Sequence, residues 1–286
     1  MPLTAMTDKK IEIRDDEFRV IGKPGVTTDP ESGRRSLVWI ILAIAAAIGI
    51  LLVVFWPKTK VESQETAVSA TQFDLEPLGV TTDRIFTERI DTLVGTVQLA
   101  IYLPHNATPV LTADVPSGSD IILAARAADV RADNGKINEA FVCEGKALAF
   151  GMSKKGYCAI LGGEVTIGVA ADSPLFEEAV ESGGYFFRQY PLVDNGTLVE
   201  NEPKNKTMRR AICSRAGQIF IAVSETDESF HDFAQALVEF GVENAIYLTG
   251  GHESGGWWVG PDGTSRPFDP KARTGIYENE TYILWK

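Results

Sequence analysis

Clusters of basic residues are missing from this chain of 286 residues, and their absence excludes one large class of partners. The 27 Lys and Arg residues form neither a run nor a basic half, and 39 Asp and Glu residues outnumber them. A protein that holds nucleic acid by charge needs a basic patch or stripe. The sequence, with a net charge of -12, therefore predicts no nucleic-acid partner. With 44% hydrophobic and 9% aromatic residues, the composition also excludes a wholly disordered chain.

Cysteine and histidine are scarce, with three of each. Cys143, Cys158 and Cys213 match no zinc-binding spacing, and nothing else in the sequence indicates a metal or a cofactor. Cys143 and Cys158 lie in what we predict to be neighbouring strands. A disulfide bridge in an oxidising compartment is therefore one alternative, and isolated buried thiols are the other. The histidines are not accompanied by a Gly-x-Ser-x-Gly elbow, so the sequence does not indicate a serine-hydrolase site.

Charge is absent from residues 37–56, which read LVWIILAIAAAIGILLVVFW and are apolar apart from Gly49. A helix of this length spans about 30 Å, the thickness of the hydrocarbon core of a bilayer. A buried core helix would need a polar edge, and a cleaved signal peptide would have a shorter apolar run with an Ala-x-Ala site. Trp39 and Trp56 suit the two membrane interfaces, and Pro57 ends the helix. The stretch predicts a single transmembrane helix.

The charges around this stretch predict its orientation. Arg34 and Arg35 abut its N-terminal end, whereas Lys58 and Lys60 lie on the other side. The portion after the span carries the whole acidic excess and is the part more readily understood as translocated. The sequence therefore predicts a single-pass membrane protein with a cytoplasmic N-terminus and a periplasmic or extracellular C-terminal domain.

Composition divides the chain into four parts. Residues 1–36 are neutral overall, contain three prolines and show no apolar period, which predicts a disordered cytoplasmic tail. The span covers residues 37–56, and the polar, Ser/Thr-rich residues 57–77 are predicted to be a linker. Residues 78–286 are numerous enough to form one domain with its own core.

Short strand-like runs bounded by Gly, Asn, Asp or Ser dominate this domain. The predicted strands are Thr92–Leu103, Ile121–Ala125, Glu139–Cys143, Tyr157–Leu161, Val165–Val169 and Gln218–Val223. Gly162 and Gly163 predict a tight hairpin turn between two of them. Apolar periodicity predicts one helix over Asp227–Phe240, capped by Ser224, and a second over Pro174–Glu181. Many strands with few helices predict an α+β fold with a mostly antiparallel or mixed sheet.

A glycine-rich turn follows the strand-like run that ends at Thr249. Gly250 and Gly251 allow backbone N–H groups to approach a ligand, so this turn can form an anion or sugar site near His252. A plain glycine-rich connection is the other interpretation. Trp257 and Trp258 follow the turn, and since strand neighbours face opposite ways, at least one of them is expected in the core.

Several motifs then occur in a recognisable order. They are Gln189-Tyr-Pro-Leu-Val-Asp-Asn-Gly, Arg209-Arg-Ala-Ile-Cys, Gly217-Gln-Ile-Phe-Ile-Ala-Val, the helix Phe230–Phe240, and Gly241-Val-Glu-Asn-Ala-Ile-Tyr-Leu-Thr-Gly-Gly. Together they resemble the phosphodiester glycosidase family over about residues 120–260. The resemblance implies removal of a sugar from a sugar–phosphate diester.

Two positions depart from the family pattern. The family's Leu-Asp-Gly-Gly is here Leu248-Thr-Gly-Gly, so that Thr249 replaces a carboxylate. The family's Asn-Gly-Gly-Phe-Phe corresponds to Arg126–Val130, which has neither the Asn nor the glycines. Because glycosidic cleavage normally uses two carboxyl groups, Glu253 and Asp129 become the candidate catalytic substitutes.

Arginines supply the candidate phosphate contacts, because a guanidinium binds phosphate through two hydrogen bonds. Arg126, Arg131, Arg188, Arg209 and Arg210 lie in this otherwise acidic domain. The resemblance favours Arg209, which aligns with the family's own Arg before Ala-Ile. The predicted substrate-binding residues are Arg209, Thr249, Gly250, Gly251, His252 and Arg126.

Two functions remain open at this point. The first is a membrane-anchored, phosphodiester glycosidase-like enzyme that hydrolyses a sugar–phosphate diester in an envelope glycan or glycoconjugate, with no cofactor. The second is a catalytically inactive glycan- or protein-binding module of the same fold at the membrane surface. The replacement of a carboxylate by Thr249 favours the second.

Overall fold

The computed structural model describes residues 84–114, 116–131, 133–252, 255–270 and 280–286. They belong to one compact unit, Pro77–Lys286. The predicted tail, span and linker all lie outside the described residues, so residues 37–56 stay a prediction. In the part of the chain that the structure describes, no helix is both long enough and apolar enough to cross a membrane.

The largest sheet has seven strands, and every neighbouring pair in it is antiparallel. In spatial order they are β1 (Phe86–Val94), β2 (Val97–His105), β13 (Gln218–Ser224), β12 (Arg210–Arg215), β14 (Asn244–Leu248), β10 (Pro191–Asp194) and β11 (Thr197–Leu198). Helix α3 (Phe230–Glu239) packs on one face of this sheet through Phe233 and Leu237. The opposite face meets the other two sheets.

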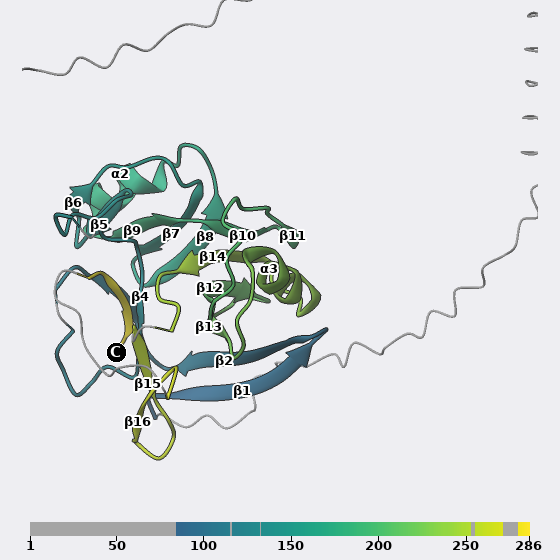
Figure 1. Ribbon diagram of the computed structural model, residues 1–286. Helices are drawn as coiled ribbons and strands as arrows, with labels where there is room; N and C mark the ends of the chain where they lie inside the picture. Colours follow the sequence, from purple (N-terminus) through teal and green to yellow (C-terminus); the bar gives the residue numbers. More distant parts are fainter. Residues whose placement is uncertain (1–83, 115, 132, 253–254, 271–279) are drawn as a thin grey trace, which may run out of the picture. The chain divides into compact units, whose positions relative to one another are not determined.

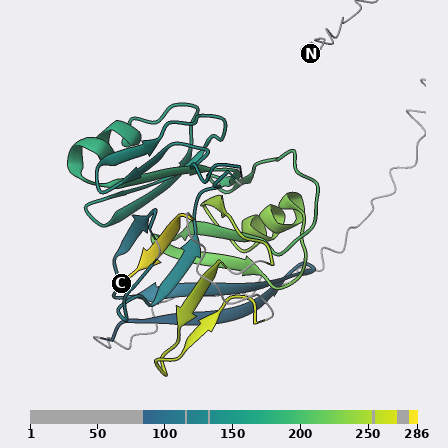
Figure 2. The ribbon, with the colours of Figure 1, turned by 60° about the vertical axis from the view of Figure 1, so that its left-hand side comes forward.

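Each of the other two sheets has five antiparallel strands. The first contains β16 (Ser265–Pro267), β15 (Gly256–Val259), β4 (Leu123–Arg126), β17 (Tyr282–Trp285) and β3 (Pro109–Thr112). The second contains β6 (Lys146–Ala149), β5 (Phe141–Cys143), β9 (Tyr185–Gln189), β7 (Gly156–Leu161) and β8 (Glu164–Val169). Helix α2 (Leu175–Ser182) lies over the second, and the hairpin β1–β2 lies at the other end of the unit (Figure 1; Figure 2). Two helices beside these sheets confirm the predicted α+β class.

One apolar core joins all three sheets. Leu248 of β14, Leu123 of β4 and Phe187 of β9 are completely buried in the same cluster. Burying these side chains from three separate sheets is the main force that holds the sheets together. It also fixes where the strands end, and these ends carry the polar residues described below.

Glycines set the two hairpins that bear most directly on the predictions. Gly162 and Gly163, at φ +58° and +88°, connect β7 to β8 and confirm the predicted turn. The prediction of a single strand over Thr92–Leu103 is wrong. Gly95 adopts φ +58° and turns the chain, so this segment contains the end of β1 and most of β2. The apolar alternation continues through the turn and conceals it.

The helices form where they were predicted, with shifted boundaries, of which the start of α3 differs most. α3 begins at Phe230 and not at Asp227, because Ser229 caps it by accepting a hydrogen bond from the Asp232 amide at 3.0 Å. The predicted cap, Ser224, instead ends β13 and accepts from a backbone amide. α2 follows Pro174 and ends at a left-handed glycine, as predicted.

All three cysteines are free thiols. Cys143 and Cys158 are not in neighbouring strands, because β9 lies between β5 and β7. Strands two places apart are separated by about 9.5 Å, beyond the span of a disulfide. The bridge alternative is therefore wrong. The alternative of buried thiols is confirmed for Cys158 and Cys213, whereas Cys143 is only half-buried.

Candidate functional site

Four polar side chains meet where strands from the three sheets end. Asp129 follows β4, Lys154 precedes β7, Gln189 is the last residue of β9, and Thr249 follows β14. They are far apart in the sequence, and the shared core beneath them brings them together. We call this set the strand-end cluster.

Hydrogen bonds close the strand-end cluster into a ring. The Thr249 hydroxyl donates to Asp129 Oδ1 at 2.6 Å and accepts from Gln189 Nε2 at 3.1 Å. The Lys154 ammonium donates to Gln189 Oε1 at 2.7 Å and forms an ion pair with the other oxygen of Asp129. Every member is thus oriented by two others, which fixes the direction of the carboxylate.

The cluster is open to solvent on the side of Asp129. The Asp129 side chain is 29% exposed, whereas that of Lys154 is 8% exposed. The Lys154 ammonium has three N–H bonds: two point to Asp129 and Gln189, and the Tyr190 ring lies 4.5 Å away. Lys154 is therefore committed to the protein, and Asp129 is the charged group that an incoming molecule can reach.

Asp129 stays ionised at neutral pH. Burial alone would raise the pKa of this carboxyl group. The charge of Lys154 and hydrogen bonds from Lys154, Thr249 and Gln189 outweigh burial, and the pKa of Asp129 is lowered. A carboxylate of this kind is a nucleophile or a stabiliser of positive charge, and it cannot serve as a general acid near pH 7.

The lowered pKa of Asp129 makes a testable prediction about acid stability. The ordinary carboxyl pKa is about 3.9. Stability contributed by ionised Asp129 is thus present above about pH 4 and lost as the pH falls through the lower folded-state value. We expect Asp129→Asn to cost about 1 kcal/mol or more of unfolding free energy at pH 7 and clearly less at pH 3, measured by urea unfolding. Asp133→Asn, in an exposed ion pair with Arg131, should have little effect on the unfolding free energy at either pH. An Asp129→Asn cost independent of pH would contradict the ionised state.

A buried guanidinium supports the glycine turn. Arg210 is 1% exposed and donates to the backbone oxygens of Thr249 at 3.3 Å and Gly251 at 2.6 Å. Burial, together with the nearby Arg126 charge, lowers the pKa of Arg210 to about 10. A Cβ atom on Gly250 would lie 1.6 Å from Arg210 Nη1, so this position needs glycine for the close approach of a side chain.

Arg209 lies on the opposite face of the sheet. It donates to the Glu228 carbonyl at 3.0 Å and to the Asn205 carbonyl, and its guanidinium lies 4.1 Å from the centre of the Phe230 ring of α3. The structure thus brings Arg210, rather than the predicted Arg209, to the glycine turn. Arg209 directly precedes β12, and consecutive residues of an extended chain point to opposite faces, which explains the difference.

The remaining predicted site residues, Arg126, His252 and Glu253, have different outcomes. Arg126 is 7% exposed and forms an ion pair with Glu280 at 2.5 Å beside the same turn. His252, at the end of the turn, interacts with Asp269 at 3.4 Å and with Asp227. These two hydrogen bonds, first to Asp227 and then to Asp269, raise the pKa of His252. Glu253 lies outside the described residues, and its catalytic role stays a prediction.

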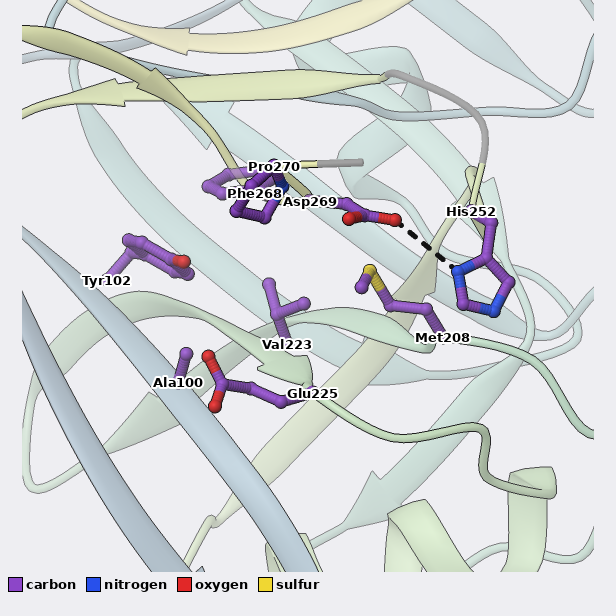
Figure 3. A pocket seen from close by; sticks show the side chains of 9 residues that line it. All are labelled: Ala100, Tyr102, Met208, Val223, Glu225, His252, Phe268, Asp269 and Pro270. Atoms are coloured by element: carbon purple, nitrogen blue, oxygen red, sulfur yellow. Dashed lines mark hydrogen bonds and ion pairs between the residues drawn. The ribbon is translucent and has the colours of Figure 1, made fainter. Parts of the chain in front are cut away.

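A pocket with a volume of about 260 Å³ opens beside His252 (Figure 3). It is lined by Ala100, Tyr102, Met208, Val223, Glu225, His252, Phe268, Asp269 and Pro270. The rings of Tyr102 and Phe268 lie 4.7 Å apart and form an apolar wall, and two carboxylates provide acceptors. Thr249 and His252 are separated by at most about 10 Å of chain, so the pocket lies close to the strand-end cluster. Among the described residues, no group of three or more His, Cys, Asp or Glu side chains is placed to hold a metal ion.

A match to a known protein family shows to which family this chain belongs. A family described as phosphodiester glycosidase matches residues 119–276, more than half of the chain. The chain belongs to the phosphodiester glycosidase family. All four residues of the strand-end cluster lie within the matched segment.

One solved structure agrees with this phosphodiester glycosidase assignment at the level of the fold. The chain is similar to the zebrafish N-acetylglucosamine-1-phosphodiester alpha-N-acetylglucosaminidase catalytic domain, which is auto-inhibited by its pro-peptide. The TM-score is 0.51 and the identity 13%, over 70% of this chain and 82% of that one. A hypothetical protein from Synechocystis gives a TM-score of 0.49 at 11% identity, over 71% of this chain and 62% of that one. No curated protein sequence matches the chain.

Two members of the strand-end cluster, Lys154 and Gln189, were not among the predicted site residues. Lys154 stands in the pair Lys154-Lys155, of which the first is buried and the second exposed. Nothing local distinguishes the two residues. Gln189 did carry a signal, since it begins the segment similar to the family's Gln-containing motif. Of the predicted site residues, Asp129 and Thr249 are the ones in direct contact with each other.

Proposed function

We propose that this member of the phosphodiester glycosidase family hydrolyses a sugar–phosphate diester between the anomeric carbon and the phosphate oxygen. The observation that carries the proposal is the ionised carboxylate of Asp129, held by Lys154 and Thr249 at an open edge of the cluster. Such a carboxylate faces the positive charge that develops at the anomeric carbon in the transition state.

The position of Asp129 supports this role. The family pattern places a carboxylate at the position that Thr249 occupies here. The Thr249 hydroxyl lies 2.6 Å from Asp129 Oδ1, so a carboxylate reaches nearly the same point from β4 instead of β14. The site therefore still contains a carboxylate, which Asp129 supplies from the segment after β4 in place of a residue after β14.

The leaving group explains how one ionised carboxylate suffices. A phosphate monoester loses its second proton with a pKa of about 6, so it departs as a stable anion without being protonated. In the proposed step the anomeric C–O bond breaks and the phosphate takes the electron pair. The Asp129 carboxylate stabilises or captures the cationic carbon. Water then adds to this carbon and releases its proton to solvent. No general acid is required, in contrast to a sugar–sugar bond.

The glycine turn is suited to the phosphate. In a trans peptide the C=O of one residue and the N–H of the next point in opposite directions. Arg210 holds the carbonyls of Thr249 and Gly251, so the N–H groups of Gly250 and His252 point away from it. We assign phosphate binding to these N–H groups, with Arg210 fixing the turn from behind. The pocket beside His252, with its rings and carboxylates, suits the sugar.

A direct assay tests the function. The full chain is incubated with sugar-1-phosphodiesters, beginning with an N-acetylglucosamine-1-phosphodiester, and release of the free sugar is measured. We expect turnover by the wild type and by Asp133→Asn, an exposed control close in sequence. Absence of turnover by the wild type on a broad panel of such diesters would contradict the proposal.

The binding-module alternative has one observation in its favour, namely the loss of the family carboxylate at Thr249. It predicts that the full chain binds a glycan without cleaving it, and that Asp129→Asn leaves this binding unchanged. Isothermal titration with an intact diester separates the two cases, because a hydrolase releases product in the calorimeter cell and a binding module does not.

We further propose that residues 37–56 anchor the enzyme in a membrane, with the N-terminus cytoplasmic and the catalytic domain outside. The uncharged run of twenty residues supports this proposal. We expect the full chain to remain in the membrane fraction after alkaline carbonate extraction. Ala46→Lys, which adds about 2.5–3.5 kcal/mol to the insertion free energy, should weaken the association. Protease digestion of spheroplasts, in which the outer face of the membrane is accessible, should remove the C-terminal domain, and its full protection would contradict the orientation.

A further inference from the structure

Two buried charged side chains lie next to the strand-end cluster, and the chemistry proposed above does not use them. Glu139 precedes β5 and is 5% exposed, and Arg188 in β9 is 1% exposed. Neither belongs to the motifs that carry the family resemblance. Both direct their polar atoms at one short segment, residues 153–154, just before β7.

The carboxylate of Glu139 holds the N-terminal side of this segment. Its Oε2 atom accepts from the Ser153 amide at 2.9 Å and from the Lys154 amide at 3.2 Å. Its other oxygen accepts from the Ser153 hydroxyl. These three donors come from two consecutive residues, so the carboxylate fixes their backbone as a unit.

The guanidinium of Arg188 holds the other side. Its Nη1 atom donates to the Lys154 carbonyl at 3.2 Å and to the Ala170 carbonyl at 2.7 Å. Burial lowers the pKa of Arg188, while the negative charges of Asp172 and Glu139 oppose that effect. The amide and the carbonyl of a single residue, Lys154, are therefore bound by two buried groups of opposite charge.

Such an arrangement has a large cost in free energy if its only role is to close a turn. Burying a carboxylate and a guanidinium costs several kcal/mol of desolvation each, and apolar side chains can often replace such pairs without loss. Here the two charges immobilise the backbone of the residue whose ammonium contacts Asp129 and Gln189. A lysine side chain is otherwise flexible and strongly hydrated.

We propose that Glu139 and Arg188 are positioning residues of the site, which hold the Lys154 peptide from both sides and so keep its ammonium against Asp129. Neither residue touches the substrate in this arrangement, and both act through Lys154. The proposal rests on the proposed function only for the use of Asp129 in hydrolysis. The placement of the lysine can be tested without any substrate.

The test measures the titration of Asp129 in the full chain. Its carboxyl carbon is followed by ¹³C NMR in aspartate-labelled protein, with Asp129→Asn providing the assignment. An opposite charge within contact lowers a carboxyl pKa by about 1 to 3 units, so Lys154→Met should raise the measured value by that amount. Glu139→Ala should raise it in the same direction, by at least about half as much. Glu139→Gln, which keeps an acceptor oxygen, should stay near the wild type.

A double-mutant comparison shows whether Glu139 acts through the lysine. In the Lys154→Met background, Glu139→Ala should cause no further change in the Asp129 titration. A persisting change, or an unchanged titration in Glu139→Ala alone, would overturn the proposal. Should Glu139→Ala not fold, Ser153→Ala removes one of the three bonds to Glu139 and should give a smaller rise of the same sign. No rise in Ser153→Ala would then overturn it.

The outcome separates this proposal from the proposed function. If the titration behaves as expected but the wild type cleaves no diester, the positioning stands and the hydrolase fails. If the wild type cleaves diesters but the Asp129 titration ignores Glu139, the hydrolase stands and the positioning fails.

Discussion

Replacement of Asp129 by Asn is expected to lower the rate of sugar–phosphate diester hydrolysis about 1,000-fold, the typical effect of removing one group that stabilises transition-state charge. Asparagine has nearly the same shape and can still accept from Lys154, so the fold should be retained. The variant should keep the far-UV circular dichroism of the wild type and bind intact diester with similar affinity. The loss should therefore appear in kcat and not in KM. An Asp129→Asn variant as active as the wild type would remove this carboxylate from the mechanism.

A second substitution makes this prediction sharper. If the carboxylate has moved from the end of β14 to the segment after β4, the double variant Asp129→Asn, Thr249→Asp should recover part of the lost rate. The single variant Thr249→Asp should lose activity, because two carboxylates in contact raise each other's pKa and one of them becomes protonated. Recovery by the double variant would not be expected if Asp129 served only to bind Lys154.

The largest expected effect on stability is at Gly250. A Cβ atom there would come within 1.6 Å of Arg210 Nη1, and Arg210 is almost completely buried. Gly250→Ala must displace this guanidinium, which loses its bonds to the Thr249 and Gly251 carbonyls while its charge stays buried. We expect a loss of about 3 kcal/mol or more in the free energy of unfolding, measured by urea denaturation.

Gly263→Ala provides the matched control. Gly263 also lies in a turn, with φ +75°, but a Cβ atom there would meet nothing within 4 Å. Its substitution should cost only about 1–2 kcal/mol, from backbone strain. Equal losses at the two glycines would mean that the Gly250 turn is not packed against Arg210, and the assignment of phosphate binding to this turn would lose its support.

The parts of the fold that local chemistry determines were predictable. Two glycines with positive φ define the β7–β8 hairpin, and the amphipathic pattern defines α3. The order of strands within a sheet was not predictable. β9 inserts between β5 and β7 although α2 separates it from them in the sequence, and this insertion makes a Cys143–Cys158 bridge impossible. Such pairing depends on the burial of distant side chains, which a local pattern does not record.

The candidate site, like the fold, was predictable from the sequence only in part. Asp129 and Thr249 were identified from their departures from the family pattern, and the structure places them in contact. The choice between Arg209 and Arg210 depended on which face of the sheet each residue points to, and the motif alone did not determine that. Lys154 was missed because the residues that bind its backbone, Glu139 and Arg188, lie 15 and 34 residues away in the sequence.

Membership of the phosphodiester glycosidase family and the zebrafish likeness bear on different questions. The family match covers the segment that contains the strand-end cluster. The structural likeness, at 13% identity, concerns the fold alone. The chemistry proposed for this chain therefore rests on its own residues, above all on the ionised Asp129, which needs no neighbouring acid.

Hydrolysis in water labelled with ¹⁸O tests the central claim most directly, because it identifies the bond that breaks. If Asp129 assists cleavage at the anomeric carbon, mass spectrometry should find the label in the released sugar and none in the phosphate monoester. Label in the phosphate would mean attack at phosphorus with cleavage of the P–O bond. That result would contradict the glycosidase mechanism and the role assigned to Asp129.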